Sequence, residues 1–559
     1  MSNFAKALQT AECTKTMNGA LSLSKPDNAG QANGRLSLLF KGVRNLNIPK
    51  LYNYLNKSST ENLLDTFCLV FHLRDCREGK GERELGRKAL VWLFLSFPKQ
   101  FRKIVHLLPE YGRWDDMLML WPNKLNISTQ TKSYLCENYC VKIENITNLQ
   151  QLQVEIVRMM GNQLELDKYN MEKGNQITLC AKWAPSENDK IDKQYHVVRT
   201  ICSIMKWTPK NYRKIYLSPL REYINIVERL MCNNDWNSID FSKVPSNAMH
   251  RLKKTFINHT PDKFLNWTNS IISGTSKINA SQLYPHEIVA SYRKNFIYNE
   301  ILEQQWKVLE NKIKTDNIFK KALCIVDVSA SMEGWGYNKN TKTPSNFVPL
   351  DVSLALGIII SNSIQDCFHN HIITFHDEPT FSVIPDGNLF SKINYLSNIP
   401  WGGSTNLVKT FNLILNKCVD NNLPEEDMPE KIFIISDMQF NYCSNTHTNF
   451  QYIDEQYKIY GYKRPQLIFW NVNGGTDDFP VSHQDYNTAL ISGFSQSLIK
   501  TIFTDNTYSP YSILRETIDN YRYQAIKDAI EPKTYNHSSG PISTPSSNKV
   551  FLSTGACFN

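Results

Sequence analysis

The chain of 559 residues exceeds what one hydrophobic core normally organises, so two or more domains are expected. Hydrophobic residues make up 41% and charged residues 21% of it, a soluble globular balance, and the longest near-apolar run, residues 89–97, is too short to span a bilayer. The first residues lack a signal-peptide pattern. These features predict an intracellular, cytoplasmic protein without a membrane partner, and packaging in a virion is a further possibility.

The net charge of +9 is divided unevenly along the chain. Residues 1–320 hold 46 Lys and Arg against 30 Asp and Glu, a net +16, whereas residues 321–559 hold 16 against 23, a net −7. A basic half favours an acidic partner, of which nucleic acid is the commonest. A solvated surface rich in Lys is the alternative, and composition does not decide between them.

Helical periodicity dominates residues 35–319. Residues 1–34 are rich in Ser, Asn, Ala and Gly and predict a flexible lead-in, and the Ser- and Pro-rich residues 532–559 predict a disordered tail. Between them, turn signals such as Trp121-Pro122 and Thr208-Pro209 separate apolar helical segments, which predicts an all-α solenoid-like or bundled domain. The expected helices lie near 62–74, 85–97, 101–108, 114–121, 149–160, 195–205, 220–232, 261–270 and 287–309. The Cys136-x-x-x-Cys140 pair is a weak metal candidate, and the 13 cysteines otherwise predict reduced thiols.

A basic turn lies between the first of these helices. In it, flexible glycines lie beside five cations, which are Arg77, Lys80, Arg83, Arg87 and Lys88. The Gly-Lys-Ser/Thr of a phosphate loop is absent, so nucleotide hydrolysis is not predicted here. The five cations predict contacts to the phosphates of an RNA backbone, and an interhelical turn with Arg/Glu pairs is an equal alternative.

From residue 320 onward strands and helices alternate, which predicts a mostly parallel, doubly wound α/β sheet over residues 320–531. The expected strands are 322–327, 371–375, 380–384, 431–436, 466–472 and 488–492. The expected helices lie near 350–366, 406–419, 449–459, 495–503 and 511–530.

Three stretches of this half place oxygen-bearing side chains at the carboxyl ends of strands. The apolar run from Ala322 ends in Asp327-Val-Ser329-Ala-Ser331, a second strand ends in Asp437, and Thr405 follows two glycines. Because ligand sites of doubly wound sheets lie at this edge, we expect these oxygens to converge. Hard divalent cations prefer such oxygen ligands. Hydroxyls that merely cap a loop or helix are the structural alternative.

This pattern resembles the metal-ion-dependent adhesion site of von Willebrand factor A domains. The resemblance implies that Ser329, Ser331 and Thr405 contact the cation, whereas Asp327 and Asp437 act largely through water. It further implies Mg²⁺, or Ca²⁺ or Mn²⁺ in its place, and an acidic protein or ligand as the partner at the metal. Ser436-Asp437-Met438-Gln439 departs from the more usual Thr-Asp-Gly, which alters the loop and keeps the acid.

A wider resemblance covers roughly residues 35–530. It is carried by the basic turn and by three further stretches, Tyr111-Gly-Arg-Trp-Asp-Asp116, Cys180-Ala-Lys-Trp-Ala-Pro-Ser186 and Asn211-Tyr-Arg-Lys-Ile-Tyr216. Together with the A-type half they resemble an uncharacterised family of large DNA viruses, plants and fungi. That family is similar in layout to the Ro autoantigen class, in which a helical-repeat TROVE module binds RNA and precedes a von Willebrand factor A domain.

The sequence therefore predicts a non-enzymatic binding protein, since no GxSxG, HExxH or kinase motif set is present. Its helical domain is expected to bind structured or single-stranded RNA, and its A-type domain to bind a partner through a cation. A virion or assembly scaffold that binds only proteins is the alternative function.

Overall fold

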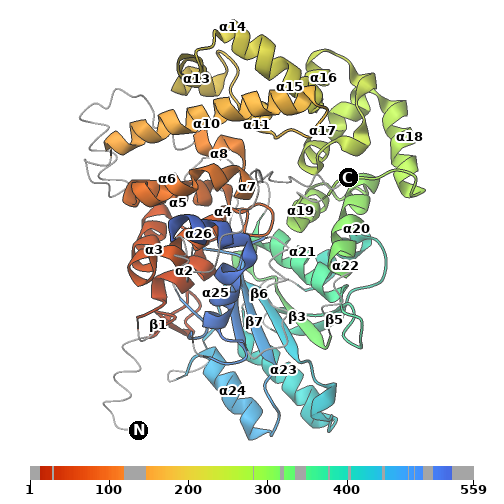
Figure 1. The fold of residues 1–559 in the computed structure, drawn as a ribbon. Coiled ribbons are helices and arrows are strands. Elements are labelled where there is room, and N and C mark those ends of the chain that lie inside the picture. The colour runs from red at the N-terminus through yellow and green to blue at the C-terminus, as the bar shows by residue number, and fades with distance from the viewer. Residues whose placement is uncertain are drawn as a thin grey trace, which may run out of the picture. The chain divides into compact units, whose positions relative to one another are not determined.

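The fold is described from a computed structural model, shown in Figure 1. It describes residues 13–27, 30–118, 146–280, 283–314, 320–333, 348–375, 378–400, 405–442, 447–475, 478–483, 485–494 and 508–531. The chain divides into two compact units. We call Met1–Leu90 with Val244–Asn520 the sheet unit, and Val91–Lys243 with Tyr521–Asn559 the helical unit.

A six-stranded mixed sheet forms the centre of the sheet unit, in the order β5-β4-β3-β6-β7-β8 (Figure 1). All neighbouring strands are parallel except the edge pair β4 and β5. The strands are β3 (Ala322–Asp327), β4 (His371–Phe375), β5 (Thr380–Val383), β6 (Lys431–Ser436), β7 (Gln466–Asn471) and β8 (Thr488–Ser492). Each begins where the sequence predicts it and ends within one residue of the prediction. The doubly wound α/β expectation is thereby confirmed at the level of sheet topology.

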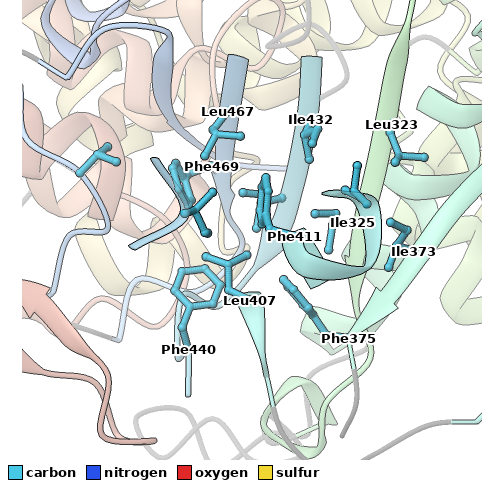
Figure 2. Packing of buried hydrophobic residues seen from close by; sticks show 14 of the residues in the cluster. Leu323, Ile325, Ile373, Phe375, Leu407, Phe411, Ile432, Phe440, Leu467 and Phe469 are labelled. Carbon is cyan, nitrogen blue, oxygen red and sulfur yellow. The ribbon is translucent and has the colours of Figure 1, made fainter. Parts of the chain in front are cut away.

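Alternate residues of these strands build the main hydrophobic cluster on one face of the sheet (Figure 2). Successive side chains of a strand point to opposite faces, so every second position reaches this cluster. Its strand residues are Leu323, Ile325, Ile373, Phe375, Ile432, Ile434, Leu467, Phe469 and Leu490. Helix α23 (Leu407–Asp420) covers them with Leu407 and Phe411, and α24 (Asn449–Ile459) packs against α23. Burying each large apolar side chain contributes roughly 1.5–3 kcal/mol.

Helix α21 (Pro349–Ser361) packs on the other positions of β3 and β6, and every one of its residues is buried. Gly357 allows this close approach, because a Cβ there would lie 2.5 Å from the Cγ2 atom of Val326. The helix packs in turn against α19 (Pro285–Asn295). Helices α20 (Glu300–Lys314) and α22 (Leu389–Asn398) are tied together by Glu303, whose carboxylate accepts from the backbone N–H groups of Leu389 and Phe390 at 2.8 and 2.9 Å.

The predicted flexible lead-in is wrong for its described part. Strands β1 (Cys13–Lys15) and β2 (Leu21–Leu23) form an antiparallel hairpin, and α2 (Asn33–Lys41) follows. The hairpin hydrogen-bonds to the chain after β6 and to Phe479, and α2 packs beside β8. The prediction failed because the partners of this polar segment lie more than 400 residues away in sequence.

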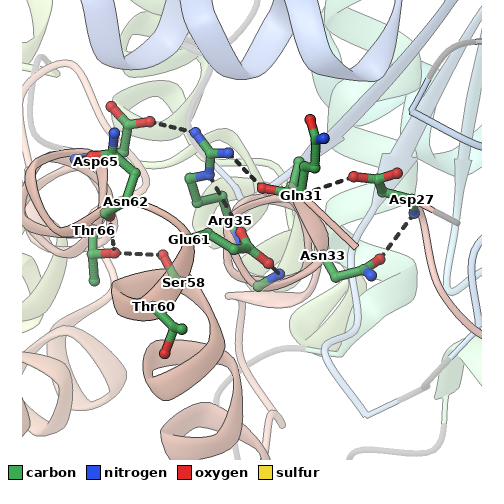
Figure 3. Close-up of polar contacts among 12 residues, drawn as sticks. Asp27, Gln31, Asn33, Arg35, Ser58, Thr60, Glu61, Asn62, Asp65 and Thr66 are labelled. Carbon is green, nitrogen blue, oxygen red and sulfur yellow. Dashed lines mark hydrogen bonds and ion pairs between the residues drawn. The ribbon is translucent and has the colours of Figure 1, made fainter. Parts of the chain in front are cut away.

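Helices α2, α3 (Ile48–Glu61), α4 (Leu63–Arg74) and α25 (Pro510–Asp519) share a buried polar network, and Figure 3 shows the part of it that lies between Asp27 and Thr66. At its centre the Arg35 guanidinium donates to Glu61 and Asp65 at 3.3 and 2.6 Å, and Arg515 donates to Asp65 at 2.8 Å. Residues 35–90, predicted as part of one helical domain, thus pack within the sheet unit. The last helices of that predicted domain belong to the sheet unit as well. They are α17 (Ser246–His259), α18 (Pro261–Ile272), α19 and α20.

Among the described residues of the helical unit, all regular secondary structure is helical. Helix α5 (Arg83–Ser96) crosses the division between the units. The unit continues through α6 (Pro98–Ile104), α7 (Leu108–Tyr111), α8 (Trp114–Leu118), α10 (Ile146–Glu172), α11 (Cys180–Trp183), α12 (Lys190–Tyr195), α13 (Val197–Met205), α14 (Pro209–Asn211), η3 (Tyr212–Leu217), α15 (Ser218–Tyr223) and α16 (Val227–Cys232), and it ends with α26 (Gln524–Ile530). The predicted helical character of this region is confirmed.

Several predictions fall outside the described residues. These are the cysteine pair at 136 and 140, the helix near 495–503 and the tail 532–559. In the part of the chain that is described, no helix is both long and apolar enough to cross a membrane.

Candidate metal centre

Two neighbouring strands at the middle of the sheet deliver acidic residues to the same edge. Strand β3 ends at Asp327, and Asp437 directly follows the last residue of the parallel strand β6. The order of the strands reverses between β3 and β6, since the chain continues from β3 toward one edge and from β6 toward the other. Doubly wound sheets bind ligands in the crevice at such a switch point.

The turn after β3 is organised around the Asp327 carboxylate. Its Oδ1 accepts from the backbone N–H and the hydroxyl of Ser329 at 2.9 and 2.6 Å, and its Oδ2 accepts from the hydroxyl of Ser436 at 2.5 Å. The hydroxyls of Ser329 and Ser331 lie 3.1 Å apart. Ser329 is buried and Ser331 is exposed, so this row of oxygens runs from the interior to the surface.

Asp437 lies beside this row, close enough for the Ser331 hydroxyl to act on its carboxylate. Burial, and then the neighbouring charge of Asp327, raise the pKa of Asp437 to about 7, although the Gln439 N–H and the Ser331 hydroxyl oppose the shift. Burial likewise raises the pKa of Asp327 above its ordinary value. Among the described residues, no cationic side chain therefore offsets the charge of these two carboxyl groups.

Thr405 is fully buried, and its Oγ1 atom has no hydrogen-bond partner among the described residues. Two hydrogen bonds join the Thr405 backbone to Asn441. The Thr405 N–H donates to Asn441 Oδ1 at 3.1 Å, and the Asn441 N–H donates to Thr405 O at 2.8 Å. Asn441 lies four residues beyond Asp437. Burying a hydroxyl without a partner costs about 1–3 kcal/mol, a cost that a ligand bound at this edge would remove.

The chain after β6 is supported by contacts that sequence reasoning missed. Ser436 bridges Asp327 and the Met438 N–H, and the N-terminal hairpin holds Gln439. The Met17 N–H donates to Gln439 Oε1 and the Asn18 side chain donates to Gln439 O, both at 2.7 Å. Met438 has a φ of 67°, the left-handed conformation that Gly favours, which accounts for Gly at this position of the more usual pattern. The side chain of Met438 packs in the main hydrophobic cluster.

These residues fit a small hard cation. Mg²⁺ prefers oxygen ligands and keeps several waters, and the edge supplies the hydroxyls of Ser329, Ser331 and Thr405 with two carboxylates behind them. Both oxygens of Asp327 already accept hydrogen bonds, which suits a carboxylate that acts through water. No group of three or more His, Cys, Asp or Glu suited to a metal occurs among the described residues. A cation at this edge would therefore depend on the hydroxyl oxygens as well as on the two carboxylates.

The five cations of the basic turn do not form one phosphate-binding surface. Lys80 and Arg87 are buried, Lys88 is half-buried, and only Arg77 and Arg83 are exposed. The Lys80 ammonium donates to the carbonyls of Leu39 and Gly42 and, at 2.8 Å, to the hydroxyl of Ser492. The prediction that Lys80 contacts RNA is therefore wrong, because its donors are used inside the sheet unit.

Two family models match this chain. One, described as a domain of unknown function (DUF2828), matches residues 123–318, and the other, described as a domain of unknown function (DUF7788), matches residues 321–538. The break between them coincides with the end of the helical region and the start of β3.

A curated relative spans most of both halves. An uncharacterized protein of Acanthamoeba polyphaga mimivirus is 28% identical over 477 residues, which cover 81% of this chain and 79% of the relative. The two models and this relative support an uncharacterised domain family that occurs in a large virus. They do not extend to the Ro class.

Proposed function

We propose that this chain is a non-enzymatic binding protein whose A-type sheet unit engages a partner through a divalent cation. The observation that carries the proposal is the buried Oγ1 of Thr405, which lacks a partner among the described residues and lies beside the loop that bears Asp437. Ser329, Ser331 and Thr405 would hold Mg²⁺ directly, and Asp327 and Asp437 through water. The bound cation would supply positive charge for an acidic group of a partner.

The sheet topology and the oxygen row support this assignment together. An oxygen cluster on an arbitrary loop carries little weight, whereas this one lies at the switch point where doubly wound sheets bind ligands. The matching order of Asp327, Ser329, Ser331, Thr405 and Asp437 supports a metal-ion-dependent adhesion site of the von Willebrand factor A type.

Replacing Ser329 and Ser331 with Ala is expected to abolish stabilisation by Mg²⁺. A ligand that binds only the folded chain stabilises it by about 2.7 kcal/mol at a concentration 100 times its dissociation constant. The wild type should therefore show a rise in melting temperature with added Mg²⁺ in a thermal unfolding assay, and the double variant should show none.

The matched control replaces Ser361 and Ser363 with Ala, two buried serines at the C-terminal end of α21 whose hydroxyls donate to Ile358 O and Ile359 O. This control should keep the full Mg²⁺ response, since neither hydroxyl lies at the sheet edge. Equal stabilisation of the wild type and the Ser329/Ser331 variant would refute the metal assignment.

RNA binding is the second part of the proposal. The net charge of +16 over residues 1–320 supports it, although the basic turn cannot carry it as first predicted. A scaffold that binds only proteins is the competing function. Salt-sensitive retention of RNA by the intact chain, measured by fluorescence anisotropy, supports RNA binding, and its absence at low ionic strength favours the scaffold.

A further inference from the structure

One stretch of the helical unit contains seven basic residues and no acidic residue. Between Asp192 and Glu222 the chain carries Lys193, Arg199, Lys206, Lys210, Arg213, Lys214 and Arg221. Arg221 is engaged in the fold, because its guanidinium donates to the carbonyls of Ala181 and Ala184 and to the Ser186 hydroxyl, each at 2.8 Å. The other six side chains are exposed.

Four of the exposed cations lie within nine residues, and we call Lys206, Lys210, Arg213 and Lys214 the basic ridge. None of their side chains forms an ion pair or hydrogen bond with another described residue. Lys210 is three residues from Arg213 and four from Lys214 in a continuous helical stretch, so these charges lie on one side of it. Like charges at this spacing repel each other by about 0.2–0.5 kcal/mol per pair, a cost that a bound polyanion removes.

The ridge is built on a rigid aromatic base. The Trp207 ring stacks on Tyr216 with a centroid distance of 4.0 Å and on Tyr212 with a distance of 6.3 Å. Tyr212 is buried, and its hydroxyl donates to Pro185 O at 2.8 Å. The motifs around Cys180–Ser186 and Asn211–Tyr216 are thus in contact. Neither of them contributes to the proposed cation site.

The backbone of the ridge has two unusual features. Tyr212–Leu217 forms a π-helix, a rare conformation that occurs often at functional sites. Lys206 has a φ of 56°, the left-handed region that L side chains rarely adopt. A Gly would adopt this conformation without strain, and the chain instead keeps a cation there.

We propose that the basic ridge binds the phosphate backbone of single-stranded RNA. The proposal rests on the proposed RNA-binding function and assigns it to the helical unit instead of the basic turn. Charges on successive turns suit an extended polyanion better than a single phosphate, and their contacts carry no base information. A membrane surface fits less well, since interfacial helices expose a broad apolar face and Ile215 is the one large exposed hydrophobic side chain in residues 196–221.

The test measures binding of the full-length chain to a labelled 20-nucleotide single-stranded RNA across a salt series. The Lys210→Gln/Arg213→Gln/Lys214→Gln variant removes three ridge charges. Each lost phosphate contact lowers the salt slope by roughly 0.7, so the slope should fall by about two units and the affinity by on the order of 100-fold at 0.1 M salt. The control Lys57→Gln/Lys417→Gln/Lys463→Gln removes three exposed charges from the sheet unit and should leave the slope unchanged.

The outcomes separate the two proposals. Wild-type chain that shows no salt-sensitive RNA binding overturns both RNA binding and the ridge. A second outcome is a wild type that binds RNA and a ridge variant that keeps its salt slope or loses no more affinity than the control. That result leaves RNA binding in place and overturns the ridge. Ridge variants that lose binding to phosphatidylserine vesicles and keep RNA binding identify a membrane site and likewise overturn it.

Discussion

Replacing Lys80 with Met is expected to lower the free energy of unfolding by roughly 2–4 kcal/mol, because it leaves buried carbonyls without their donor. The Lys80 ammonium satisfies Leu39 O and Gly42 O at the end of α2, where a helix has no intrahelical donors of its own. It also binds Ser492 at the end of β8, so it joins α2 to the sheet. Chemical denaturation of the intact protein measures the loss.

The pH dependence identifies the cause of that loss. Burial lowers the pKa of Lys80 to about 7, while the charge of Glu82 opposes the shift. Between pH 7 and 10.5 the unfolded chain holds a proton that the folded chain has released, so wild-type stability rises with pH, by up to about 1.4 kcal/mol per unit. The Met variant should lack this slope. Lys57→Met, at an exposed position, should change stability by less than about 0.5 kcal/mol. A Lys80→Met variant as stable as Lys57→Met would contradict the buried role.

Replacing Asp65 with Asn is expected to destabilise the protein by roughly 3–5 kcal/mol, since it removes the shared partner of two guanidinium groups. Arg35, whose contact with Asp65 is drawn in Figure 3, and Arg515 both donate to Asp65 Oδ2, at 2.6 and 2.8 Å, and Asp65 is almost fully buried. Without the carboxylate, Arg35 keeps Glu61 alone for its buried charge. Unfolding in denaturant measures this loss as well.

Asp519→Asn is the matched control, because the Asp519 carboxylate pairs with the same Arg515 from an exposed position. Such surface pairs contribute about 0–1 kcal/mol. If both variants lose the same small amount, the network of Figure 3 is no more than a surface ion pair.

The sheet was predictable from sequence because its signals are local. Buried parallel strands appear as short apolar runs such as 431–436, and turn residues bound them. The candidate site was predictable for a related reason, since Asp327 and Asp437 occupy positions at strand ends, and parallel strands bring their carboxyl ends to one edge. The helix α22 was missed although Leu389, Ile393 and Leu396 are spaced as on one face of a helix, and its N-terminus depends on Glu303 from another element.

Contacts between distant parts of the chain escaped prediction. Thr16 donates to Phe440 O and Ser22 to Phe479 O, pairs separated by more than 400 residues, and the polar composition around them resembles that of a linker. Lys80 was wrongly predicted to contact RNA for the same reason, because its partner Ser492 is distant in sequence. A cation in a turn with glycines and other cations indicates a solvated charge, and nothing local reveals that Ser492 and the end of α2 enclose it.

Calorimetric titration of Mg²⁺ into the wild type, Thr405→Val and Thr410→Val tests the cation site most directly. Thr410 is equally buried, but its hydroxyl donates to Asn406 O at 2.9 Å within the same helix, so Thr410→Val controls for the loss of a buried hydroxyl. In metal-free buffer Thr405→Val should be at least as stable as the wild type, because a methyl group replaces a hydroxyl without a described partner. The account predicts one Mg²⁺ bound per chain by the wild type and by Thr410→Val, and none by a folded Thr405→Val. Wild-type affinity in Thr405→Val, or no binding by the wild type, would contradict it.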